Sequence, residues 1–190
     1  MIQRRILYRL WLRRLRKLIR NDQLILSILA VVVGAAAAFG TILIRISITY
    51  IETIFMDTGG GSIVARAADL PWWQIIMVPT LGGLIVGLFI FYFIPGRRPQ
   101  GIANVIEASA LRGGRMSLRT GIGAAIASSA SIGAGASVGR EGPAVHLGAT
   151  FGAWIAEKLH LTRSLSRALL GCGAAAAVAA SFNAPIAGAL

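Results

Sequence analysis

Three long runs of residues without a charged side chain constrain the fold of this chain more than any other feature. They cover Leu24–Ile44, Trp72–Ile94 and Ala168–Leu190. A helix crosses the hydrocarbon core of a bilayer in roughly 20 residues, so each run is long enough for a membrane span. Hydrophobic residues make up 56% of the chain, whereas soluble domains average about 45–50%. The sequence therefore predicts an all-α, polytopic integral membrane protein.

The net charge of +12 is concentrated at the N-terminus, where eight of the 19 Lys and Arg residues lie within the first 20 positions. Apolar residues recur there at helical spacing, which predicts a basic amphipathic helix over 1–22 that lies on the inner membrane surface as an anchor. Basic residues before a first span mark the cytoplasmic side, so we expect residues 57–70 on the exterior. Aromatic residues are not interleaved with the other basic residues, so we expect membrane lipid and no nucleic acid as a partner.

The second part of the chain is built from shorter segments that Gly and Pro interrupt. Helices are expected over 100–111, 121–136, 143–158 and about 163–180. Broken helices place backbone termini inside a membrane, and irregular backbone is tolerated at that depth where it lines a cavity. Residues 23–190 are therefore predicted to form one transmembrane domain of a transporter or channel.

The break at 137–142 contains the most informative motif, Gly139-Arg140-Glu141-Gly142-Pro143. Proline suits the first turn of a helix, and the glycines let the backbone turn sharply and expose its amides. Free amides at the positive end of a helix form an anion site. A carboxylate at the same terminus competes with an anion for this site, and a protonated carboxyl group does not. Glu141 is therefore predicted to gate an anion and to carry a proton.

The alternative is a structural ion pair between Arg140 and Glu141. A carboxylate within a membrane is costly to bury, which favours function for Glu141, whereas Arg140 is expected to be structural. His146 is expected to serve in packing or hydrogen bonding. An intramembrane enzyme needs a nucleophile with a base or two acids, and only Glu141 and Glu107 are deep enough. We therefore expect no enzyme activity, no metal and no cofactor.

Two strings carry a resemblance to a known family. They are GREGPAVHLGA at 139–149 and GAAAAVAASFNAPIAGAL at 173–190, and they closely resemble the CLC family of chloride channels and transporters. The resemblance covers about residues 20–190. It implies the first half of an inverted-repeat fold with tilted and broken helices, a homodimer with one pore per subunit, and Glu141 as the gating glutamate. It also implies transport of chloride or a similar small anion, by channel conduction or by proton-coupled antiport with H⁺.

The family's other anion-binding stretch in this half, Gly-Ser-Gly-Ile-Pro, corresponds to Pro99-Gln100-Gly101-Ile102-Ala103. Gln100, Gly101 and Ile102 therefore join residues 139–143 in the expected anion-binding set. Gln100 replaces a serine whose hydroxyl faces the ion. Its amide also donates hydrogen bonds, but the side chain is longer and differently placed, which leaves the preference between chloride and nitrate open.

The family's second half, with its inner proton-transfer glutamate and its conducting tyrosine, is expected beyond Leu190. Channel and antiporter therefore both remain open, as does a regulatory domain in the cytoplasm. A truncated fragment that does not transport is the main alternative. The expected location is the plasma (inner) membrane of a prokaryote, crossed several times, with a cytoplasmic N-terminus.

Overall fold

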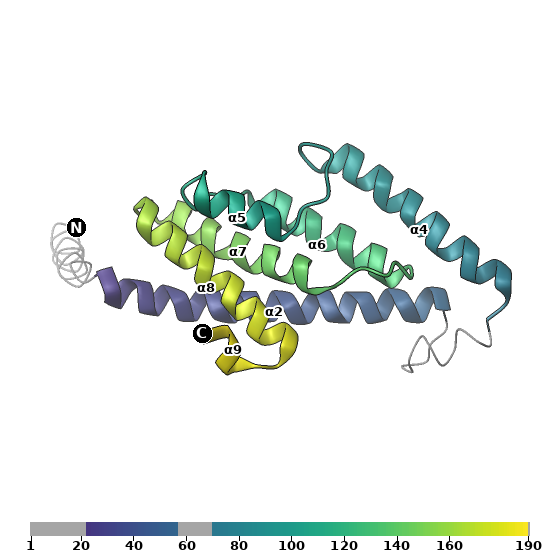
Figure 1. The fold of residues 1–190 in the computed structure, drawn as a ribbon, viewed down its shortest axis with the longest axis horizontal. Helices are drawn as coiled ribbons and strands as arrows, with labels where there is room; N and C mark the ends of the chain where they lie inside the picture. The colour runs from purple at the N-terminus through teal and green to yellow at the C-terminus, as the bar shows by residue number, and fades with distance from the viewer. Residues whose placement is uncertain (1–21, 57–69, 190) are drawn as a thin grey trace, which may run out of the picture.

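The computed structural model describes residues 22–56 and 70–189, and every regular element in these ranges is a helix. The helices are α2 (Asp22–Met56), α4 (Trp72–Phe93), α5 (Ile102–Ala110), α6 (Leu118–Gly133), α7 (Glu141–Lys158), α8 (Arg163–Phe182) and α9 (Pro185–Ala189) (Figure 1). The predicted all-α class is confirmed. The predicted surface helix up to residue 21 and the loop over 57–69 lie outside the described residues.

Helix α2 is the longest of the described helices. Its 35 residues make it about 52 Å long at 1.5 Å per residue, more than the roughly 30 Å of a hydrocarbon core. It runs along almost the whole length of the molecule (Figure 1) and packs against α6, α7 and α8. By length and composition, α2 from Gln23 onward, α4 and α8 are each able to cross a membrane. The chain is therefore a membrane protein whose described part holds three candidate spans.

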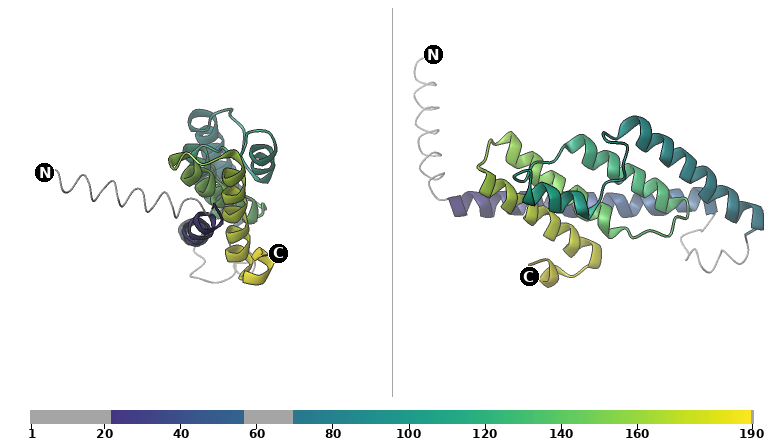
Figure 2. Two further views of the ribbon diagram at one scale, coloured as in Figure 1. Left: turned by 90° about the vertical axis from the view of Figure 1, so that its left-hand side faces the viewer. Right: turned by 45° about the horizontal axis from the view of Figure 1, so that its top comes forward.

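Helix α7 lies at the centre of the fold. Every residue from Ala144 to Thr150 is buried, so two full turns are covered on all sides. The covering helices are α2, α5, α6 and α8 (Figure 2). A helix that is surrounded in this way needs no polar face, and this explains why its sequence shows no amphipathic pattern. The motif at its N-terminus is therefore held by the best-packed helix of the structure.

Glycines let α7 and α8 pack backbone to backbone. A Cβ atom on Gly148 would collide with the carbonyl oxygen of Gly173, and one on Gly173 would collide with that of Gly148. One turn further along α7, a Cβ atom on Gly152 would collide with the carbonyl oxygen of Leu169. Gly148 and Gly152 are four residues apart, the spacing at which small residues let membrane helices approach closely.

Helix α4 is the least covered of the long helices. Only 6% of its most apolar stretch is buried, and α4 packs mainly on α6. Trp72 and Trp73 at its start are 75% and 55% exposed, as expected for side chains at a membrane interface. The amide Nε2 of Gln74 donates a hydrogen bond of 2.8 Å to the carbonyl oxygen of Phe55, which joins the start of α4 to the end of α2.

The helix predicted over about 163–180 matches α8. The uncharged run Ala168–Leu190 is longer than this helix, because α8 ends at Phe182 and the next residue, Asn183, adopts a left-handed conformation with φ of 53°. Asparagine tolerates this conformation, which commonly ends helices, and the proline at the start of α9 cannot continue α8.

The small-residue helix runs from Leu118 to Gly133 rather than over 121–136. It ends before Gly135, whose φ of 97° excludes a helical continuation. A Cβ atom on Gly135 would also lie 2.8 Å from the methyl group of Met56, a flexible side chain that can move aside, so the backbone conformation is what favours glycine there.

Candidate functional site

Helix α7 begins at Glu141, two residues earlier than predicted, so the glutamate is the first helical residue and not part of the preceding loop. Arg140 takes the N-cap position, and no side chain caps the helix. The first backbone bond runs from the amide of Ala144 to the carbonyl oxygen of Arg140, at 3.4 Å. The amides of Glu141 and Gly142 precede this bond and have no intrahelical partner, and Pro143 carries no N–H. The start of α7 thus presents free donors and a positive dipole end.

The carboxylate of Glu141 folds back over Gly139. A Cβ atom built on Gly139 would lie 2.7 Å from Oε2 of Glu141, so the carboxylate lies directly against this glycine. In the described ranges the one ion pair is that of Glu107 with Arg112, at 2.7 Å, and Glu141 takes part in no side-chain hydrogen bond. The alternative ion pair between Arg140 and Glu141 is therefore not formed in this structure.

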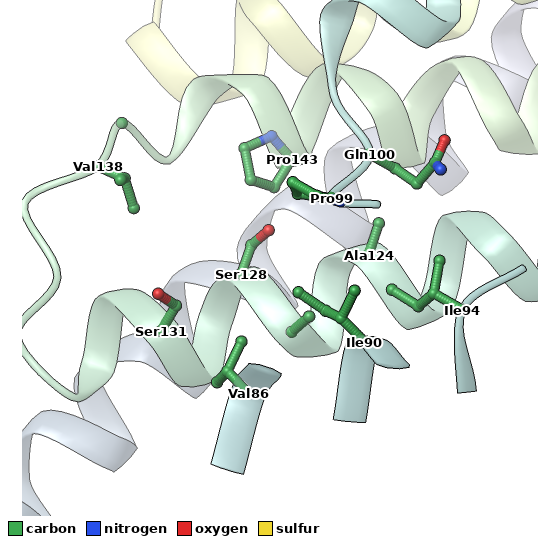
Figure 3. Close-up of a pocket in the computed structure, with 12 residues that line it drawn as sticks. Val86, Ile90, Ile94, Pro99, Gln100, Ala124, Ser128, Ser131, Val138 and Pro143 are labelled. Carbon is green, nitrogen blue, oxygen red and sulfur yellow. The ribbon is translucent and has the colours of Figure 1, made fainter. Parts of the chain in front are cut away.

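A cavity of about 270 Å³ lies beside this terminus, between α4, α6 and the chain segments that precede α5 and α7 (Figure 3). It is lined by Val86, Ile90, Ile94, Pro99, Gln100, Ala124, Ala127, Ser128, Ser131, Val138, Gly139 and Pro143. Its wall is mainly apolar and contains no charged side chain. The cavity brings together Gln100, Gly139 and Pro143, which come from the two stretches that the sequence singles out.

Other predicted residues of the first stretch do not line this cavity. Gly101 is the N-cap of α5, and its amide donates a hydrogen bond of 3.0 Å to Oδ1 of Asn104. Ile102 is exposed. Gln100 lines the wall, but its amide Nε2 donates to the carbonyl oxygen of Arg98 at 3.3 Å. Figure 3 shows the amide end of Gln100 turned away from Pro143. The backbone amide of Gly101 is therefore bonded to Asn104 and is not free to bind an ion.

Two serines of α6 that line the cavity were not among the residues predicted from the sequence. Ser128 and Ser131 are three residues apart, so both face the cavity from one side of the helix. Figure 3 shows their hydroxyl groups on the wall opposite Pro143. The sequence does show serines spaced along a helix that otherwise holds small apolar residues, and this pattern could have indicated a polar face. With Gln100, they are the polar side chains of the cavity wall.

The remaining predicted residues lie elsewhere. Arg140 is exposed and lines a different, smaller cavity. Gly142 is partly buried and has open space where a Cβ atom would lie. His146 is 1% exposed and packed within the bundle, as expected of a packing residue, and its Nδ1 has no hydrogen-bond partner in the described part of the chain. No group of three or more His, Cys, Asp or Glu that could hold a metal occurs among residues 22–56 and 70–189.

Comparison with known proteins extends this description to a family. The family model described as voltage gated chloride channel matches residues 82–190, more than half of the chain and all of the candidate site. A putative chloride channel protein ClcB-like of Ralstonia nicotianae is 37% identical over 166 residues, which cover 85% of this chain and 38% of the relative.

Further relatives are described as voltage-gated ClC-type chloride channel ClcB. That of Escherichia coli is 31% identical over 165 residues, covering 86% of this chain and 39% of the relative. That of Yersinia pseudotuberculosis is 28% identical over 165 residues, covering 86% and 40%. The chain thus spans about two fifths of the length of these curated relatives. On the match of the family model, this chain belongs to the voltage-gated chloride channel family.

Proposed function

We propose that this chain contributes to the pathway by which a CLC-type protein moves chloride or a similar small anion across a membrane. The observation that carries the proposal is the position of Glu141. Its carboxylate lies at an uncapped helix start, folded over Gly139. Gly139 and Gln100 line the same cavity. The relatives are named as chloride channels and not as enzymes.

The chemistry of the cavity fits a weakly held anion. The hydroxyls of Ser128 and Ser131 line the wall and offer partial positive charge, and the positive end of α7, where the amides of Glu141 and Gly142 are free, lies beside it. No lysine or arginine lines the wall, so nothing there binds an anion so tightly that it cannot leave. Conduction requires this balance between entry and release.

Glu141 acts as the gate in this proposal. When its carboxylate is ionised, it competes with the anion for the amides at the start of α7. When it is protonated, it loses the charge that competes, and the anion enters. This cycle suits channel conduction and proton-coupled antiport with H⁺, and the transported anion is the ligand we propose, without a cofactor.

The domain arrangement follows from the same family. We propose that residues 23–190 form the first of two inverted halves, that residues 1–22 lie on the cytoplasmic surface of a prokaryotic inner membrane, and that two copies form a homodimer. The length of the relatives, of which this chain covers 38–40%, supports a site that a second half completes.

Anion flux tests the proposed function directly. The full protein, purified and reconstituted in liposomes loaded with chloride, is expected to release chloride faster than empty liposomes do. A folded, correctly assembled protein without flux would favour the alternative of a membrane protein that does not transport.

Gln100 is predicted to influence which anion is preferred. In Gln100→Ser, a hydroxyl on a short side chain replaces an amide that is bonded to Arg98, so the ratio of chloride to nitrate flux should change by about two- to twelvefold, which corresponds to the roughly 0.5–1.5 kcal/mol of one hydrogen bond. Gln23→Ser, the same exchange at an exposed residue of α2, is the control. An unchanged ratio in Gln100→Ser would place this side chain outside the pathway.

The orientation is predicted from the basic N-terminus. A cysteine introduced as Ser62→Cys, in a background where the native thiol is removed by Cys172→Ser, should react with a membrane-impermeant maleimide added to intact cells. The background protein alone is the control. Labelling only after permeabilisation would reverse the orientation.

A further inference from the structure

A second cavity, of about 50 Å³, touches the start of α7 on a different face. It lies between α2, α7 and α8 and is lined by Thr41, Ile42, Ile44, Arg45, Arg140, Ala144, Ala180 and Ser181. None of these residues lines the larger cavity of Figure 3. The two cavities are therefore separate, although they share the terminus that carries Glu141.

Two arginines, Arg45 and Arg140, line this small cavity although both residues are largely exposed, and no carboxylate lines it. Among the described residues, neither Arg45 nor Arg140 forms an ion pair, since the one pair present joins Glu107 and Arg112. Glu52, about two turns beyond Arg45 on α2, forms no ion pair with either arginine in the described ranges. Two positive charges beside one small cavity favour a bound counter-charge.

The hydroxyl of Ser181 also indicates a missing partner in this cavity. Its oxygen is buried and has no hydrogen-bond partner in the described part of the chain. Thr41, on the same wall, is different, because its hydroxyl donates a bond of 2.9 Å to the carbonyl oxygen of Ala37. The wall thus offers guanidinium donors and one unused hydroxyl donor. A buried polar group without a partner in a native structure requires an explanation, such as a bound ion or water.

We propose that this cavity binds one small inorganic anion, such as chloride or bromide, between Arg45, Arg140 and Ser181. An anion accepts hydrogen bonds from all three groups and compensates both charges, whereas a water molecule compensates neither. The volume of about 50 Å³ accommodates a single halide, since one water molecule takes about 30 Å³ in the liquid. This site lies outside the proposed pathway and does not depend on transport.

A structural role for the arginines is the rival explanation. Ser181 belongs to the last turn of α8, whose free carbonyl groups attract cations. In this explanation Arg45 and Arg140 cap these carbonyls in other conformations, although neither side chain donates such a hydrogen bond in the ranges that the structure covers. Capping requires no anion, so anion binding separates the two explanations.

Bromide provides the test, because its anomalous scattering marks its position in a crystal of the full protein. We expect a bromide peak in the cavity of the wild-type protein and none in Arg45→Gln. By calorimetry, loss of one charged donor, worth about 1.5–3 kcal/mol, should weaken bromide binding at this site by about tenfold or more. Ser181→Ala should weaken it by about threefold or more. Arg45→Lys should recover part of the loss.

Arg119→Gln is the matched control. It removes one positive charge from an exposed residue of α6, near the opposite half of α7, where Gly121 packs on Thr150. Bromide binding should stay unchanged in this variant. A wild-type cavity without bromide, or bromide binding that both Arg45→Gln and Ser181→Ala leave intact, would overturn the proposal in favour of capping. Inorganic phosphate that displaces bromide from the cavity at lower concentration would overturn the assignment to a halide-sized anion.

Discussion

Glu141→Gln is expected to leave anion flux in the full protein while removing most of its dependence on external pH and any coupled proton flux. The physical reason is the position of the carboxylate at the uncapped start of α7, next to Gly139. Without its charge, the amides of Glu141 and Gly142 stay free for the anion at every pH, and the side chain has no proton to exchange. Glu141→Ala should behave in the same way. Chloride and proton fluxes are measured side by side on protein of the correct oligomeric size.

Glu107→Gln is the control for this experiment. Glu107 is also a glutamate near a helix end, but its side chain is 41% exposed and paired with Arg112, and exposed pairs of this kind contribute little, about 0–1 kcal/mol. Its replacement should leave the pH dependence unchanged. A folded Glu141→Gln protein that still couples protons normally would remove Glu141 from the mechanism.

An ion pair between Arg140 and Glu141 would predict another outcome. Breaking a buried pair leaves an uncompensated charge and costs about 3–5 kcal/mol, so the variant would misfold. Arg140 is exposed and unpaired with Glu141 in the described structure, and we therefore expect the variant to fold. Size-exclusion chromatography of the purified variant distinguishes the two outcomes before any flux is measured.

Gly173→Leu is expected to abolish accumulation of the folded protein. The atom in the way of a side chain at this position is the carbonyl oxygen of Gly148, so relief requires that α7 and α8 move apart along their contact. Overpacking costs about 1–3 kcal/mol where side chains give way, and a backbone obstacle raises this cost. The change should remove a large part of a typical stability of about 5–15 kcal/mol.

The matched control lies two residues away on the same helix. Gly171 is exposed, and no atom lies within 4 Å of the point where its Cβ atom would stand, so Gly171→Leu should be tolerated. Fluorescence-detected size-exclusion chromatography and a thermal melt in detergent compare the two variants. A stable Gly173→Leu protein would mean that α7 and α8 do not pack backbone to backbone.

The class of this protein and the location of its long helices could be predicted from the amino-acid sequence alone. Apolar runs with no charge are a local property, so Leu24–Ile44 and Trp72–Ile94 predicted α2 and α4 without knowledge of any contact. The motif around Glu141 predicted a helix start for an equally local reason, since glycine and proline restrict the backbone where they stand.

Which of these segments meet depends on helix packing and could not be predicted in this way. The cavity shared by Gln100 and Pro143, the serines that face it from α6, and the small cavity between Arg45 and Arg140 all depend on which helix faces pack together. In α6, α7 and α8 nearly every residue is small or apolar, so hydropathy does not distinguish one face from another. The close contacts of Gly148 with Gly173 and of Gly152 with Leu169 favour one arrangement, because glycine lets the backbones of α7 and α8 approach at these points.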